Sequence, residues 1–334
     1  MTVIGREGGV GVMSSARACA RGFLRRGVKA VAAGVDLLRP PAPGVVVLIY
    51  HRVGGKSSAE IDLSVDLFAE QMAWLADTGR VVSLDEAMGF FVGSAYQNGS
   101  RADTSRASLQ EGSVEAGRSD ELAGKTRGRL ARKRLGEAGV SPRQMPVVVT
   151  FDDGTLDWVE NVQPVLEKHR VPATFYVATD FVERGQCFPD GGVPISWAGL
   201  QDLLSSGFVT IGSHTHRHLL LDRLSAREVG DELDRSIGLI GERLGVQASH
   251  FAYPKAVAPS PEAEEMVRQR FLTAALAGTK ANPFYGSDLH RLQRSPVQTS
   301  DGMGYFRRKT SGGMSAEDYL RRLLNRRRYA DAAS

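Results

Sequence analysis

The sequence predicts an α/β protein built on a parallel sheet, either an open sheet or a closed barrel. Continuous apolar runs at residues 45–50 and 147–151 are typical of strands buried on both faces. After the second run, strand and helix patterns alternate at short intervals, which indicates parallel strands joined by helices. The 334 residues are 42% apolar and 24% charged, so the chain can bury a large core without disulfides or structural metals.

The first expected elements follow a basic leader at residues 1–43. We expect this leader to be poorly ordered or to form an amphipathic helix over 23–38, which the following prolines stop. The first strand ends at Tyr50. The spacing of apolar residues then predicts a helix over 66–77, and Ser83 with Glu86 has the pattern of a capping box that starts another helix.

Residues 93–144 interrupt this pattern. They are rich in Ser, Gly, Arg and Glu and contain few large apolar side chains. A stretch of this length without structural signals, inside a compact domain, indicates a disordered insertion.

The remaining elements alternate in type after the strand at 147–151. We expect helices at 159–169, 196–206, 226–244 and 261–270, with strands at 173–177, 208–212, 249–253, 271–275 and 292–297. A basic C-terminal helix and tail occupy 301–334. In parallel α/β folds the chemistry lies at the carboxyl ends of strands, so the candidate site residues should follow these strands.

Two carboxylates, Asp152 and Asp153, leave one such strand just before Gly154. Adjacent side chains of a continuing strand face opposite ways, but a turn at the glycine can bring both into one pocket. An isolated Asp-Asp-Gly would more often be an ordinary acidic turn, so other residues expected near it must show whether this motif belongs to a functional site.

Those partners follow the strand at 208–212. His214 and His218 are four residues apart, a spacing that places both rings on one side of a helical turn and suits one metal ion. With a strand-end aspartate they make a two-histidine, one-carboxylate set with open positions for water, which iron oxygenases also use. The second carboxylate fits hydrolysis better. His216 should point away from this face.

Three motifs in this order resemble the polysaccharide deacetylase family, which has NodB homology and is carbohydrate esterase family 4. They are Thr-Phe-Asp-Asp-Gly at 150–154, His-Thr-x-x-His at 214–218 and Phe-Ala-Tyr-Pro at 251–254. The connecting sequence Pro-Ala-Thr-Phe-Tyr-Val-Ala-Thr-Asp at 172–180 also fits the family pattern. The resemblance implies a distorted (β/α) barrel of about seven strands, forming a single catalytic domain over 44–300.

The resemblance also implies site roles and a substrate. Asp153, His214 and His218 would hold a divalent metal, often zinc, and Asp152 would be the general base. The backbone amide of Lys255 would stabilise the oxyanion. The substrate would be an acetylated polysaccharide, oligosaccharide or glycolipid.

The chain departs from the family pattern at two places. Ala252 stands where the family usually has an arginine, and Lys255-Ala256 replace an aromatic-glycine pair. We expect Arg294 to supply the missing guanidinium beside Asp152. His290 is one candidate for the family's late histidine acid. However, Tyr50-His51 resembles the subset that carries this histidine on the first strand, so we assign the general acid to His51.

The function predicted from the sequence is therefore a metal-dependent hydrolase that removes N-acetyl or O-acetyl groups from a glycan. One alternative is hydrolysis of another acyl or non-peptide C–N bond at the same site. A second alternative is a catalytically degenerate, glycan-binding relative.

The formal net charge of +4 is concentrated at the two ends of the chain. Lys and Arg outnumber acids by seven to two in residues 1–40 and by eight to two in residues 307–328. We expect solvated ends that can touch an anionic membrane peripherally, and no nucleic-acid partner. With no signal peptide or spanning segment, and two cysteines far apart in sequence, the expected location is the cytoplasm.

Overall fold

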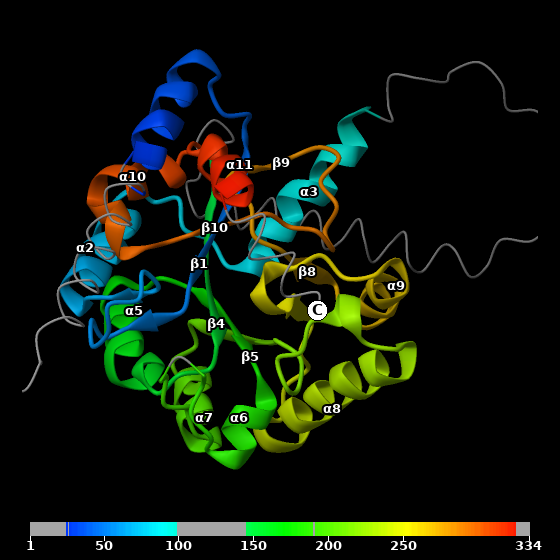
Figure 1. The fold of residues 1–334 in the computed structure, drawn as a ribbon. Helices are drawn as coiled ribbons and strands as arrows, with labels where there is room; N and C mark the ends of the chain where they lie inside the picture. The colour runs from blue at the N-terminus through cyan, green and yellow to red at the C-terminus, as the bar shows by residue number, and fades with distance from the viewer. Residues whose placement is uncertain (1–24, 26, 99–144, 190, 325–334) are drawn as a thin grey trace, which may run out of the picture.

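The fold is built around one curled sheet of parallel strands (Figure 1). The computed structural model describes residues 25, 27–98, 145–189 and 191–324. A parallel bridge between Ala275 and Leu292 joins the two ends of the sheet, so the predicted distorted barrel of seven strands is confirmed. In spatial order, the strands are β10 (Arg294–Pro296), β1 (Gly44–Tyr50), β4 (Val147–Asp153), β5 (Ala173–Val177), β6 (Val209–Ser213), β7 (His250–Ala252) and β8 (Thr273–Ala275).

Helices surround this sheet (Figure 1). Two of them begin and end where the sequence predicts, namely α8 (Ala226–Leu244), which a capping box starts, and α9 (Pro261–Arg270). The others are α2 (Val65–Asp77), α3 (Leu84–Asn98), α5 (Gln163–His169), α6 (Thr179–Arg184), α7 (Trp197–Ser205), α10 (Gly302–Lys309) and α11 (Ser315–Leu324). Three short strands lie outside the parallel order: β2 (Arg52–Val53) pairs with β3 (Asp62–Leu63), and β9 (Asn282–Pro283) pairs antiparallel with β1.

Alternate side chains of β1 belong to two different cores. Val46, Leu48 and Tyr50 pack in the large cluster with the surrounding helices, whereas Val45 and Val47 pack in a second cluster with Tyr176 and Leu292 inside the barrel. This alternation follows from the pleat of a strand. On β4 the same rule directs Val148, Thr150 and Asp152 to one face.

The segment before β4 differs from the sequence prediction. The helix α3 starts at the predicted capping box of Ser83 and Glu86 and continues to Asn98, so residues 93–98 of the expected insertion are helical. Residues 99–144 lie outside the described part of the chain. The chain returns at Met145, at the amino end of β4, where Val147 pairs with Val81.

The basic ends are less solvated than the sequence suggests. Residues 27–38 are helical, and Lys29 is 1% exposed because it pairs with Asp301 and Glu317. Lys309, in the expected basic tail, is likewise 1% exposed and pairs with the same two acids. Charge counting cannot distinguish a solvated lysine from one buried against acids that lie far away in sequence. Residues 1–24 and 325–334 lie outside the description. Within the described ranges, no helix is both long and apolar enough to cross a bilayer.

Candidate active site

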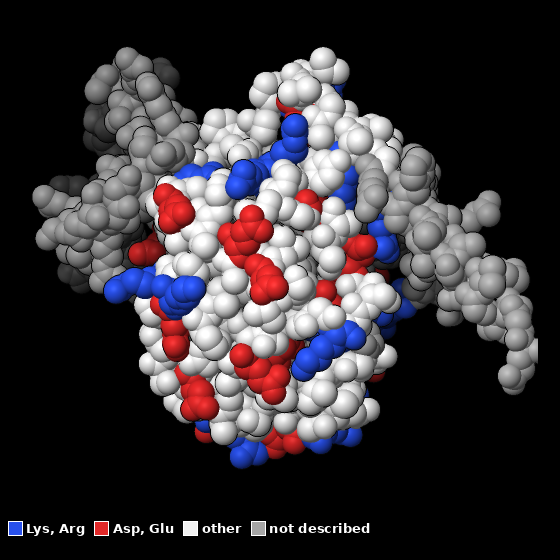
Figure 2. Space-filling view, turned by 90° about the vertical axis from the view of Figure 1, so that its left-hand side faces the viewer, with Lys and Arg blue, Asp and Glu red and all other residues white. Residues whose placement is uncertain are grey.

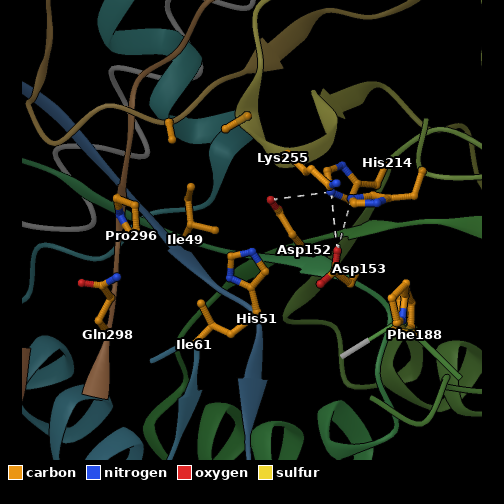
Figure 3. A pocket seen from close by; sticks show the side chains of 14 residues that line it. Ile49, His51, Ile61, Asp152, Asp153, Phe188, His214, Lys255, Pro296 and Gln298 are labelled. Carbon is orange, nitrogen blue, oxygen red and sulfur yellow. Dashed lines mark ion pairs between the residues drawn. The ribbon is translucent and has the colours of Figure 1, made fainter. Parts of the chain in front are cut away.

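The predicted site residues converge on one pocket at the carboxyl ends of the strands (Figure 3). The pocket has a volume of about 450 Å³. Its polar side includes Asp152 and Asp153 from the end of β4 and both histidines from the loop after β6. The rest of its lining is mostly apolar and includes Ile49, Ile61, Phe188, Pro189, Ala277 and Pro296.

Both aspartates reach the pocket because the backbone turns at the second one. Asp153 has a φ of 86° and Gly154 a φ of 120°. These values lie in the region that side chains rarely adopt and that glycine tolerates. The turn brings the Asp153 carboxylate to the same side as Asp152, where a regular strand would have sent it to the opposite face.

Asp153, His214 and His218 form a set of donor atoms suited to one metal ion. Their ligand atoms all lie within 4.8 Å of one another. Asp153 Oδ1 is 3.7 Å from His214 Nε2 and 3.6 Å from His218 Nε2. Two ligands of one tetrahedral zinc ion at bond lengths of about 2.1 Å lie about 3.4 Å apart, so the observed separations need little adjustment.

A hydrogen bond on the far side of His214 prepares the ring for this role. Its Nδ1 lies 2.7 Å from the carbonyl oxygen of Ala252. Because a carbonyl only accepts, Nδ1 carries the hydrogen and Nε2 keeps a free lone pair directed toward Asp153. Burial lowers the pKa of His218 to about 4, so this ring is neutral at pH 7. Two imidazoles and a carboxylate are a donor set that fits zinc.

The histidine pair does not lie on a helical turn, contrary to the sequence prediction. Residues 214–218 form a non-helical loop in which Thr215 and His218 have φ values of 63° and 61°. The Thr215 hydroxyl accepts a hydrogen bond from the backbone N–H of His218 at 2.9 Å and thereby fixes the bend. The two rings still meet, with centroids 4.7 Å apart. His216 points away, toward Thr179 and Asp180.

Arg294 holds the second carboxylate. From β10 its guanidinium reaches across β1 and donates from Nη1 to Asp152 Oδ1 at 2.6 Å and from Nη2 to Oδ2 at 2.8 Å. The guanidinium also donates hydrogen bonds to Leu276 O and Thr150 Oγ1, which hold it in this orientation. Burial alone would raise the pKa of Asp152, but the charge and the hydrogen bonds of Arg294 lower it to about 2. Asp152 is therefore a buried anion, 3.9 Å from His214 Nε2.

The two candidate general acids, His51 and His290, lie in different surroundings. His51 lines the pocket, and its buried Nδ1 has no hydrogen-bond partner in the described part of the chain. His290 is absent from the pocket lining. Its Nε2 bonds to the carbonyl oxygen of Phe271 at 2.8 Å, and its Nδ1 lies 3.3 Å from Arg268.

Lys255 lies in the loop after β7 and also lines the pocket. Lys255 and Ala256 both have positive φ values, 51° and 53°, which makes a tight turn at the rim. The N–H of Ala256 is used within this turn, because it donates to Tyr253 O at 2.9 Å.

Sequence patterns did not identify every residue of the pocket lining. Ile61, Phe188 and Gln298 line the pocket but belong to no motif. Gln298 lies four residues after Arg294, at the carboxyl end of β10, and that position is a signal that could have identified it.

Comparisons with known proteins identify one family that this chain resembles. The sequence profile described as polysaccharide deacetylase matches residues 139–268. The putative polysaccharide deacetylase YxkH of Bacillus subtilis is 24% identical over 171 residues, which cover 49% of this chain and 57% of YxkH. The aligned segment therefore spans little more than half of that relative.

Solved structures share the fold. IcaB from Ammonifex degensii matches 81% of this chain and 98% of its own chain, with a TM-score of 0.58 and 22% identity. The deacetylase PplD from Streptococcus pyogenes, solved in complex with acetate, matches 78% of this chain and 97% of its own, with a TM-score of 0.54 and 16% identity. The profile match spans both carboxylates and both histidines of the site, so residues 139–268 of this chain are similar to the polysaccharide deacetylase family.

Proposed function

We propose that this chain is a metal-dependent hydrolase that removes acetyl groups from an acetylated polysaccharide, oligosaccharide or glycolipid. One observation carries the proposal. A carboxylate outside the donor set, Asp152, lies 3.9 Å from a histidine of a two-histidine, one-carboxylate set, in a pocket of the family-matched domain.

The residues of the donor set fit a divalent cation, and zinc is one ion that two imidazoles and a carboxylate bind. A cation held there would acidify water and polarise the acetyl carbonyl.

The protein groups around this position have complementary roles in the proposal. Asp152 accepts a proton from the attacking water, and Arg294 keeps the carboxylate oriented for that transfer. His51 donates a proton to the departing sugar nitrogen, or to oxygen in an ester. The backbone N–H of Lys255 faces the developing oxyanion at the rim.

The alternatives make different demands on the same pocket. An iron oxygenase needs three ligands but no ionised second carboxylate clamped by an arginine. A glycan-binding relative without activity needs neither Asp152 nor a complete donor set. Hydrolysis of another acyl or C–N bond would use the same groups, so substrate tests must separate it from deacetylation.

Acetate release from tri-N-acetylchitotriose and from an O-acetylated xylan tests the proposal directly. We expect release by the wild-type protein in the presence of zinc. Asp152→Asn should reduce it by about 10²-fold to 10⁴-fold while leaving metal content unchanged. Undiminished turnover by that variant would show that Asp152 is not the base.

A peripheral contact of the basic ends with anionic membranes is a separate proposal. It cannot use Lys29 or Lys309, which are buried in ion pairs, but Arg39 and Arg307 are exposed. On the face of the molecule that Figure 2 shows, basic and acidic side chains are interspersed. Co-sedimentation with phosphatidylserine vesicles at low and high salt tests it.

A further inference from the structure

A buried group of two lysines and two acids lies behind one wall of the pocket. We call Lys29, Asp301, Lys309 and Glu317 the lysine–acid cluster. Lys29 pairs with Asp301 and, at 3.3 Å, with Glu317, while Lys309 lies 2.9 Å from Asp301 and 3.1 Å from Glu317. No side chain of the four is more than 10% exposed. The charges balance, so removing any one of them leaves an uncompensated buried charge.

The cluster is attached to the pocket through Gln298. The Lys29 ammonium donates to Gln298 Oε1 at 3.3 Å, and the backbone N–H of Asp301 also donates to this side chain. In return, the backbone N–H of Gln298 donates to Asp301 Oδ2 at 2.8 Å. Lys309 donates to the carbonyl oxygen of Pro296 at 2.7 Å. Both Pro296 and Gln298 line the pocket.

These contacts determine which way the Gln298 carboxamide faces. An ammonium and a backbone N–H can only donate, so the carboxamide oxygen must face the cluster. The –NH₂ group, with two donors, is then turned away from Lys29 and toward the pocket. Figure 3 shows Gln298 across the pocket from Asp153 and His214, beyond His51 and beside Pro296.

The surroundings of this –NH₂ group favour a ligand role. Ile49, Ile61, Ala277 and Pro296 give the neighbouring lining an apolar surface. Ligand sites combine such apolar surface with a few fixed polar groups that set orientation. We propose that Gln298 binds the substrate, donating from Nε2 to a hydroxyl or carbonyl oxygen of the saccharide, and that Lys29 is a positioning residue that holds the carboxamide. This inference rests on the proposed glycan substrate.

Binding without turnover tests the proposal. The affinity of the Asp152→Asn protein, loaded with zinc, for tri-N-acetylchitotriose is measured by calorimetry. Adding Gln298→Glu keeps an acceptor for Lys29 but removes both pocket donors, and Gln298→Leu removes the whole amide. We expect each to weaken binding by about 10-fold, the effect of one hydrogen bond. Gln293→Leu, the same change on a side chain outside the pocket, should leave the affinity unchanged.

Testing the role of Lys29 requires a measurement that would not change if Lys29 only stabilised the fold, and trisaccharide affinity is such a measurement. We expect Lys29→Met to weaken trisaccharide binding as Gln298→Leu does, and to add nothing when the two are combined. Lys29→Arg should restore binding because it keeps a cationic donor. A lower melting temperature with unchanged affinity would make Lys29 structural only.

The result also separates this inference from the proposed function. Acetate release is measured on the same wild-type preparation. An affinity that does not depend on Gln298, or no trisaccharide binding by the parent protein, overturns the role of Gln298 even if acetate is released. Binding that depends on Gln298 without acetate release supports the inference and refutes deacetylation.

Discussion

Arg294 on β10 binds both carboxylate oxygens of Asp152 on β4, although strand β1 separates the two strands. The register explains the reach. Arg294 is level with Val47 on β1, and Val47 is level with Val148 on β4, so the guanidinium must extend along the barrel interior toward Asp152. Because the guanidinium and the carboxylate are buried in contact with each other, the Asp152 carboxylate stays ionised and keeps its orientation.

Removing this guanidinium should impair the base. In Arg294→Met we expect kcat/KM for acetate release to fall by about 10²-fold or more, because burial then favours the protonated acid. The depressed pKa of Asp152 must rise, so the acid limb of the kcat/KM profile should move to higher pH. Arg291→Met is the matched control, since Arg291 pairs with Glu264 away from the pocket. Equal pH profiles for wild type and Arg294→Met would exclude this role.

The same pair predicts an acid-sensitive contribution to stability. The folded pKa of Asp152, about 2, is below its ordinary value of 3.8, so its ionised form stabilises the fold above pH 4. That contribution is lost as the pH falls from about 4 to about 2. Urea unfolding of metal-free protein between pH 5 and 3 should show a steeper loss for wild type than for Asp152→Asn. Parallel curves would contradict the expected linkage.

The metal donors can be tested without any substrate. His214→Ala should weaken zinc binding by well over about 10-fold, because it removes a ligand and the lone pair that Ala252 orients. His216→Ala is the control from the same loop, since this ring faces Thr179 and Asp180. Metal content after dialysis, measured by mass spectrometry, distinguishes them. Full zinc occupancy in His214→Ala would refute the assigned donor set.

Chelation should abolish acetate release reversibly. Treatment with a chelator, followed by gel filtration, should leave a folded protein because the two core clusters are built from buried apolar side chains. Adding one equivalent of zinc should restore activity. Activity that survives chelation and is unchanged by added zinc would contradict metal dependence.

The two candidate acids differ in a way that kinetics can resolve. His51→Gln should lower kcat by about 10²-fold to 10⁴-fold with metal content unchanged, because His51 alone of the two lines the pocket. His290→Gln should leave kcat within about twofold, since His290 bonds to Phe271 outside the lining. The reverse pattern would move the acid to His290.

Much of the fold and of the site could be predicted from the sequence. The strand at 45–50 and the helices at 226–244 and 261–270 follow from hydrophobic patterning and caps, which are local. The two-aspartate motif and the histidine pair could be identified because each is a short segment next to a strand end. Arg294 could be proposed only because this chain has Ala252 where the family pattern usually has an arginine.

What could not be predicted depends on backbone angles and distant contacts. A helical turn and the bent loop at 214–218 both bring His214 and His218 together, so spacing alone cannot choose between them. The burial of Lys29 depends on Asp301 and Glu317, which lie more than 270 residues away in sequence. Gln298 belongs to no motif, and its placement depends on that cluster.

The segment that precedes β4 joins the barrel at the end opposite to the catalytic pocket. Met145 leads into the amino end of β4, whereas Asp152 and Asp153 lie at its carboxyl end. Met145 therefore enters the barrel one full strand length away from the reaction centre, and the positions of Asp152 and Asp153 depend on the pairing of β4 with β5 at the carboxyl end. A reporter attached just before Met145 would join the fold at the end away from the catalytic carboxylates.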